Sequence, residues 1–151
     1  MRRISWVAGA AMVALMCGVL QAADQTLVTI YKNPWCGCCE SWAIALKESG
    51  YAVELRDLDD LSGIKQSLGV PDELQACHTA KIGDYFVEGH VPLEAISQMM
   101  SKRPDIAGLA VPGMPKGSLG MGVDPNAQYD VYAVPKMEGG APSVFYRVAP
   151  Q

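Results

Sequence analysis

Apolar residues are concentrated at the start of the chain, where Arg2 and Arg3 are followed by an apolar stretch over residues 6–20. A basic start, a short apolar segment and small residues such as Ala22 and Ala23 are typical of a secretory signal peptide. The stretch is shorter than the roughly 20 residues that a membrane-spanning helix needs. We therefore expect residues 1–22 to be a signal peptide and residues 23–151 to form one periplasmic domain.

The rest of the chain alternates strand-like and helix-like patterns. β-Branched and aromatic residues favour strands, and turn residues separate these from helical segments. The elements predicted up to residue 100 are strands at 26–31, 51–55, 79–82 and 85–88, helices through 42–46, 61–68 and 92–100, and a helical turn at 71–74. The first helix follows a turn that contains three cysteines.

Beyond residue 100 the pattern changes. Residues 104–126 are rich in Pro, Gly, Met and Ser, which predicts a long ordered loop or lid, and two closing strands follow at 129–134 and 143–148. A loop of this length inside a compact domain is usually functional or disordered. The prediction is an α/β protein with a mixed sheet, a long Gly/Pro/Met loop and a C-terminal strand extension.

Charge and length narrow the choice of partners. The net charge is -4 and the sequence pI is about 5.1, so the chain lacks the basic surface that nucleic acids or anionic membranes attract. Once the signal peptide is cleaved, no other segment is long and apolar enough to suggest a membrane span. An uncleaved N-terminal anchor is the alternative to cleavage.

Cysteines are the most informative residues. Cys17 should leave with the signal peptide, and of the other four, Cys36, Cys38 and Cys39 lie so close together that they cannot join distant segments. A Cys-x-x-Cys turn at a helix start lowers the pKa of its first thiol, and the thiolate is both a nucleophile and a soft metal ligand. The pair Cys36 and Cys39 alone cannot separate the two roles.

The third cysteine of the cluster favours metal binding. A disulfide-exchange enzyme needs one attacking and one resolving thiol, and Cys38 would invite wrong pairings. Adjacent helical residues point in different directions, so Cys38 and Cys39 favour bridging among several copper(I) ions over one tetrahedral ion. Zinc bound by three cysteines and a histidine stays open but is less favoured, as does a disulfide with a spare thiol.

The pair Cys77 and His78 precedes the third predicted strand. The order of elements is that of thioredoxin or glutaredoxin, and residues 35–39 resemble the Trp-Cys-Gly-x-Cys turn of those proteins. In thioredoxin-like proteins a cis-proline beside this turn keeps metals away from the thiols, and here Cys77 and His78 stand at its place. This replacement is the strongest indication of a metal site.

Three further residues could add ligands. His90 closes the fourth predicted strand, and alternating strand directions place it at the same sheet edge as the cysteine turn. It could be a ligand, a partner of a ligand or a residue of the helix entry. Met114 and Met121 carry soft thioethers in the long loop, although hydrophobic packing would explain them equally well.

Four motifs in this order resemble one family, the CopG family of bacterial periplasmic copper-resistance proteins. They are Cys36-Gly37-Cys38-Cys39, Cys77-His78-Thr79-Ala80, Glu88-Gly89-His90-Val91-Pro92 and Pro112-Gly113-Met114-Pro115-Lys116-Gly117-Ser118. The resemblance extends from about residue 26 to 121. Leu119 is a departure, because the family's loop is expected to have a proline at this place.

The resemblance implies a thioredoxin-like core and copper binding through the four cysteines, with His78, His90, Met114 and Met121 as further candidates. It also implies a role in copper tolerance beside other periplasmic copper-handling proteins, and it leaves open a copper-dependent oxidoreductase activity. The alternatives are a periplasmic thiol-disulfide oxidoreductase and a partner-binding module whose cysteines are oxidised.

Overall fold

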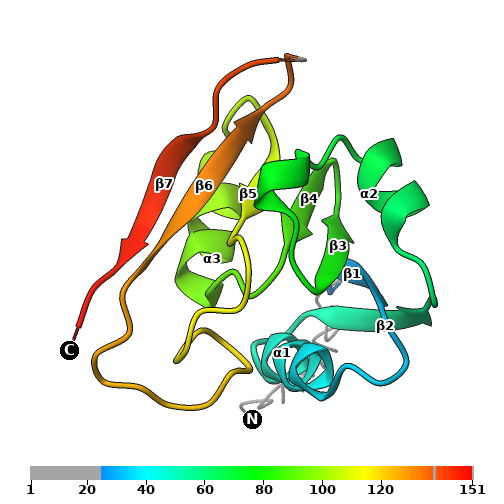
Figure 1. Ribbon diagram of the computed structural model, residues 1–151, viewed down its shortest axis with the longest axis vertical. Coiled ribbons are helices and arrows are strands. Elements are labelled where there is room, and N and C mark those ends of the chain that lie inside the picture. The colour runs from blue at the N-terminus through cyan, green and yellow to red at the C-terminus, as the bar shows by residue number, and fades with distance from the viewer. Residues whose placement is uncertain (1–24, 138, 151) are drawn as a thin grey trace, which may run out of the picture.

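A computed structural model describes residues 25–137 and 139–150 (Figure 1). The predicted signal peptide lies outside the described residues. Within those residues, no helix combines the length and the apolar character that crossing a membrane requires.

The part of the chain that the structure describes is an α/β fold built on one mixed sheet of seven strands, in the order β2-β1-β3-β4-β5-β6-β7. Strands β1 and β2 are parallel, as are β4 and β5, and the other neighbours are antiparallel. The strands are β1 (Leu27–Lys32), β2 (Ala52–Asp57), β3 (His78–Ile82), β4 (Tyr85–Glu88), β5 (Ile106–Ala110), β6 (Tyr129–Pro135) and β7 (Ser143–Val148). The sheet is strongly twisted, so that β2 crosses the direction of β6 and β7 (Figure 1).

Within the described residues, three α-helices and a short 3-10 helix accompany the sheet: α1 (Gly37–Glu48), α2 (Ser62–Ser67), η1 (Asp72–Leu74) and α3 (Leu93–Lys102). Helix α2 begins beside Asp60, whose carboxylate accepts hydrogen bonds from the Ser62 amide and hydroxyl at 2.8 and 2.9 Å. This carboxylate satisfies an amide that the first helical turn leaves free.

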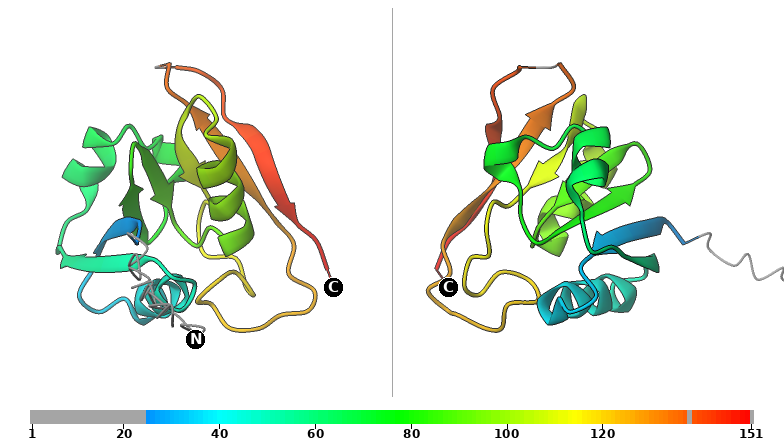
Figure 2. Two further views of the ribbon diagram at one scale, coloured as in Figure 1. Left: turned by 180° about the vertical axis from the view of Figure 1, so that it is seen from behind. Right: turned by 45° about the vertical axis from the view of Figure 1, so that its right-hand side comes forward.

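The two faces of the sheet form two cores. Residues on β4 and β5 alternate between them, as the twofold period of a strand requires: Val87 and Leu109 belong to the larger core, and Phe86 and Ala110 to the smaller. Helices α1 and α3 pack on the larger core, and the segment after α2 packs on the smaller. Figure 2 shows α3 covering the sheet from behind.

Strand β5 corrects the prediction that residues 104–126 form one long loop. Its central position buries both faces, so Ile106–Ala110 lacks the polar alternation that marks a half-exposed strand. Gly108 also argues against a strand by propensity, but a Cβ there would lie 2.3 Å from the Phe86 carbonyl oxygen. The irregular segment therefore begins after Ala110, and it runs beside α1 (Figure 1).

Gly89 allows a close approach between three segments near the end of β4. It has φ +71, and a Cβ on it would lie 2.5 Å from the Val111 carbonyl oxygen and 2.6 Å from the Ala76 Cβ. Gly69 has nearly the same φ, +72, but faces open space. The two positions separate the effect of crowding from that of backbone strain.

Gly89→Ala is expected to destabilise the protein more than Gly69→Ala. Both substitutions place a side chain at positive φ, which costs about 1 to 2 kcal/mol of unfolding free energy. Gly89→Ala also overpacks its surroundings, which costs about 1 to 3 kcal/mol more. Chemical denaturation of the two variants measures the difference. Equal losses of unfolding free energy would show that the three segments are not tightly packed.

Candidate metal centre

The cysteine turn connects β1 to α1. The Cys36 amide donates to the Asn33 carbonyl at 3.0 Å, and the Trp35 amide donates to the Asn33 side chain at 3.1 Å, which closes a tight turn. Cys36 is the N-cap residue of α1, so its side chain lies by the free amides of the first helical turn.

Cys38 and Cys39 lie on the first turn of α1 and differ in exposure, since Cys39 is fully buried and Cys38 is partly exposed. Their Sγ atoms nevertheless lie within 4.8 Å of each other, so the geometry does not support the prediction that adjacent helical positions keep these two thiols from facing one ion. Cys36 and Cys39 form a disulfide, whereas Cys38 and Cys77 are free. The structure therefore describes an oxidised state, and Cys36 and Cys39 become thiolate ligands only after reduction.

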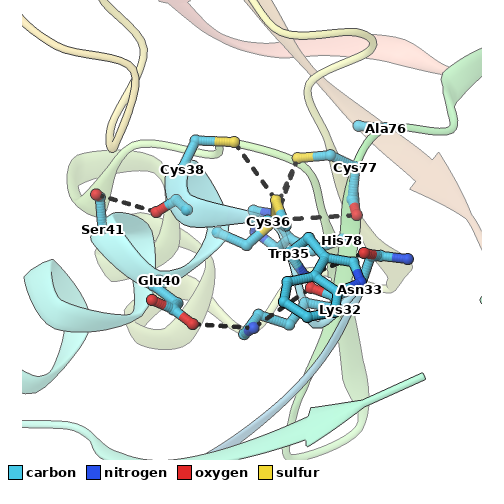
Figure 3. Close-up of a disulfide and its surroundings, with 12 residues drawn as sticks. Lys32, Asn33, Trp35, Cys36, Cys38, Glu40, Ser41, Ala76, Cys77 and His78 are labelled. Carbon is cyan, nitrogen blue, oxygen red and sulfur yellow. Dashed lines mark hydrogen bonds and ion pairs between the residues drawn. A yellow bond between two sulfur atoms is a disulfide. The ribbon is translucent and has the colours of Figure 1, made fainter. Parts of the chain in front are cut away.

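Four sulfur atoms meet at this point. The Sγ atoms of Cys36 and Cys38 are 3.5 Å apart, and Cys39 Sγ is 3.6 Å from Cys77 Sγ. The Sγ atoms of all four cysteines lie within 4.8 Å of one another. Figure 3 shows the Cys38 and Cys77 side chains pointing toward the disulfide from separate segments. Once the Cys36–Cys39 disulfide is reduced, the four together could hold a metal ion.

Cys77 also belongs to a second group of possible ligands. Its Sγ is 3.0 Å from His90 Nε2 and 3.4 Å from His78 Nδ1. The ligand atoms of Cys77, His78 and His90 lie within 4.8 Å of one another. The structure thus brings together six of the eight predicted ligands, and Cys77 is common to both groups.

Both histidines are held neutral. Burial lowers the pKa of His78 to about 3, and it also lowers the pKa of His90. His90 Nδ1 lies 2.7 Å from the Leu119 carbonyl, which can only accept, so Nδ1 carries the hydrogen and the lone pair of Nε2 faces Cys77. A neutral imidazole whose second nitrogen is bonded to a carbonyl is the usual form of a histidine metal ligand.

His78 is packed inside the larger core. Its ring centroid lies 4.6 Å from that of Trp42 and 5.0 Å from that of His90. Within the described residues, its Nε2 is the one buried side-chain nitrogen or oxygen that has no hydrogen-bond partner. A buried polar atom without a partner is costly, so it is expected to have a functional reason.

The long loop reaches the site through its backbone. Gly113 forms a bridge with Ala76, and a Cβ on Gly120 would lie 2.7 Å from the Cys38 carbonyl oxygen and 2.9 Å from the Trp42 amide. Met114 follows the first of these glycines and is 56% exposed, while Met121 follows the second and is partly exposed. The part that their thioethers play as ligands stays a prediction.

Three features of the site were missed by sequence reasoning. The Leu119 carbonyl is a backbone group, so no residue type signals it. Lys65 and Glu88 are buried charges beside the Cys77 segment. Glu88 lies in a motif that drew attention through His90, but its own contact with Lys65 depends on a fold that brings β4 to α2.

The fold and the site define a small α/β protein with a compact group of cysteine and histidine ligands. Residues 74–121 match the family described as "Protein of unknown function, DUF411". No curated protein sequence matched the chain.

Two solved structures are similar to the chain over most of its length. One, titled "Copper resistance protein copG- Form 1", is 36% identical, with a TM-score of 0.77, and the match covers 85% of this chain and 100% of that one. The other, titled "Copper resistance protein copG- Form 2", is also 36% identical, with a TM-score of 0.76, and the match covers 83% of this chain and 99% of that one. The chain belongs to the CopG family of copper resistance proteins, as its motifs indicated.

The reactivity of Cys77 tests the geometry of the site without a metal. Burial, together with neighbouring Cys38, raises the pKa of the Cys77 thiol to about 12. Only the thiolate is alkylated, so in the folded, oxidised protein the iodoacetamide rate at Cys77 should still rise with pH above 10. Peptide mass spectrometry follows the modification, and the urea-unfolded chain is the control, in which the rate should level off near an ordinary thiol pKa of about 8.5. A plateau at that pH in the folded protein would contradict the buried position.

Proposed function

We propose that this protein binds copper(I) in the periplasm as part of copper resistance, and that it holds several ions in a copper-thiolate cluster. The observation that carries the proposal is the position of Cys77, which is shared by a group of four sulfur ligands and a group of one sulfur and two imidazoles. A ligand common to two groups is the natural bridge between two or more ions. The titles of the related structures support copper as the metal.

The donor set favours copper(I) over zinc. Thiolates are soft ligands that select copper(I), and imidazoles suit copper as well. Zinc prefers four ligands in one tetrahedron, whereas here six donors come from two overlapping groups. Met114 and Met121 would add soft thioethers if the loop carries them toward the sulfur atoms. The low pKa of His78 keeps that imidazole neutral, so that one of its ring nitrogens has a lone pair available to a metal.

We also propose that the core is thioredoxin-like. The support is the order β2-β1-β3-β4, in which β1 and β2 are parallel and β1, β3 and β4 are antiparallel neighbours. The cysteine turn joins β1 to α1, as in the active-site turn of that fold. Strands β5, β6 and β7 then form the C-terminal extension of the sheet.

The location and the partners follow from the same proposal. A leader over residues 1–22 would direct residues 23–151 to the periplasm as one domain, where other copper-handling proteins would deliver or receive copper. An oxidising compartment also fits a state in which Cys36 and Cys39 are joined.

Anaerobic titration of the reduced protein with copper(I) tests the proposal. We expect more than one ion per chain, because Cys77 is shared between two groups of possible ligands. Metal analysis and the ultraviolet absorption of copper-thiolate bonds give the stoichiometry, and Cys17→Ser removes the thiol outside the site. A one-to-one endpoint would refute the cluster, and displacement of copper(I) by zinc at equal concentration would refute the choice of metal.

One observation favours a second function, a thiol-disulfide oxidoreductase of thioredoxin-like type. Cys36 and Cys39 form the disulfide that such an enzyme uses. Against it, Cys77 and His78 stand where those enzymes hold a cis-proline, and the described residues contain no cis peptide bond. Cys77 Sγ lies 3.6 Å from Cys39 Sγ and would compete for the resolving thiol.

Insulin reduction separates the two functions. We expect weak exchange from the metal-free protein and further loss when copper(I) is bound, because a coordinated thiolate is no longer a free nucleophile. His78→Pro should lower copper(I) affinity, while its exchange stays low or rises. Rapid exchange by the unaltered protein, at the rate of a thioredoxin run in parallel, would favour the oxidoreductase.

A further inference from the structure

A buried ion pair lies behind the Cys77 segment and has no part in the function proposed so far. Lys65 is on α2 and Glu88 ends β4, and their side chains are 7% and 0% exposed. Lys65 Nζ donates to Glu88 Oε1. Burying two charges costs several kcal/mol, and a well-packed apolar pair of similar size is often as stable. Stability alone is therefore a weak reason for this pair.

The contacts of the pair point to the residue before Cys77. Glu88 Oε1 accepts a hydrogen bond from the Ala76 amide at 2.6 Å, and Lys65 Nζ donates to the Ala76 carbonyl at 3.1 Å. The pair thus binds both backbone polar groups of Ala76. Hydrogen bonds to charged groups are stronger than neutral ones, so this backbone is firmly held.

The same pair also holds the residue after His78. Lys65 Nζ donates to Thr79 Oγ1 at 3.0 Å, and Thr79 Oγ1 donates to Glu88 Oε2 at 2.5 Å. Cys77 and His78 are therefore bracketed by two residues, Ala76 and Thr79, that are fixed by one ion pair. The two ligands cannot shift along the strand without breaking these bonds.

Residues 88–90, one short stretch of chain, contact the Cys77 segment at several points. Glu88 binds the Ala76 amide, Gly89 lies against the Ala76 side chain, and His90 Nε2 lies 3.0 Å from Cys77 Sγ. The Gly89 amide also donates to the His78 carbonyl at 2.9 Å. A displacement of Ala76 would therefore change the distance between two proposed ligands.

We propose that Lys65 and Glu88 are positioning residues, which fix Ala76 and Thr79 so that Cys77 meets both Cys39 and His90. The inference rests on the proposed copper site for its functional meaning. Opposite charges in direct contact leave little net charge to act on the sulfur atoms, so placement of the ligand, more than electrostatics, is what the pair supplies. Its loss should weaken copper binding although neither residue is a ligand.

The test uses the double variant Lys65→Met with Glu88→Gln, in a chain that carries Cys17→Ser. Replacing both partners avoids leaving one buried charge unpaired. We expect copper(I) affinity, measured by competition with a chromophoric chelator, to fall by about 10- to 100-fold, as for other residues that orient metal ligands. The copper-thiolate absorption spectrum should change as well, because the Cys77 sulfur would lie differently.

A core variant controls for lost stability. Val131 is fully buried on β6 and makes no part of the bracket, so Val131→Ala destabilises the protein without touching Ala76. It should bind copper(I) with unchanged affinity and an unchanged spectrum. If the double variant behaves like Val131→Ala, the ion pair is merely structural and the proposal is wrong.

A metal-free measurement separates this proposal from the proposed function. With Cys17, Cys36 and Cys38 changed to Ser, Cys39 and Cys77 are the two cysteines left of five. Their oxidation forms one disulfide while one oxidised glutathione is reduced to two thiols. The equilibrium gives the effective concentration of Cys77 at Cys39, which should fall several-fold when Lys65→Met and Glu88→Gln are added.

The outcomes of the two assays differ. If the protein with its ligands intact binds no copper(I) but the glutathione equilibrium shifts as expected, the proposed function fails and the positioning role stands. If that equilibrium does not change, the positioning role fails whatever copper does. Should the double variant not fold, Thr79→Val removes only the hydrogen bonds of the Thr79 hydroxyl to the ion pair. It should lower the copper(I) affinity and the effective concentration of Cys77 at Cys39, each to a smaller extent. No change in either would overturn the proposal.

Discussion

The antiparallel pairing of β1 with β3 is the constraint on which the site depends. The register pairs Lys32 with His78, so the end of β1 and the start of β3 lie at one edge of the sheet. The cysteine turn follows β1 and Cys77 precedes His78, which brings two distant segments into contact. Strand β4 returns antiparallel to β3 and β5 runs parallel to β4, so His90 and the long loop reach the same edge.

This edge of the sheet adds possible ligands that the cysteine turn alone cannot provide. Cysteines within one turn can offer sulfur atoms, but they cannot supply the buried imidazoles that complete a ligand set. His78 comes from the start of β3 and His90 from the segment after β4, and both side chains are buried, with His78 packed against Trp42. Burial keeps the imidazoles neutral, so a metal would not have to displace a proton from them, although it would still have to displace one from the Cys77 thiol.

Much of this arrangement could be predicted because it follows from chain direction and residue type. The elements of the first hundred residues, the helical start at the cysteines and the position of His90 all depend on local pattern and on alternating strands. Strand β5 could not be predicted from pattern, since a central strand buried on both faces has no polar alternation. Gly108 is disfavoured in strands, and its reason for being there is a tertiary contact, because a Cβ at this position would collide with Phe86. Its omission made the predicted loop too long.

Sequence reasoning could name the candidate ligands of the site, but it could not name the residues that support them. Cysteine and histidine indicate metal binding by their residue type. The Leu119 carbonyl is a backbone group of a kind that every residue has, so the sequence does not single it out. Lys65 and Glu88 are ordinary surface residue types, and only tertiary contact shows that they are inside. The disulfide was among the alternatives for the cysteines, but spacing alone could not choose between a disulfide and two free thiols.

The proposed ligands differ in exposure, so the site has an open side and a buried side. Cys36, Cys38 and Cys77 are partly exposed, whereas Cys39, His78 and His90 are fully buried. An incoming ion would therefore meet sulfur at the mouth and reach nitrogen only at the floor. Trp35, which is 90% exposed, stands at the entrance beside Cys36. If the site holds several ions as proposed, those near the exposed sulfur atoms would exchange with the surroundings first, and those near the buried imidazoles would be the last to leave.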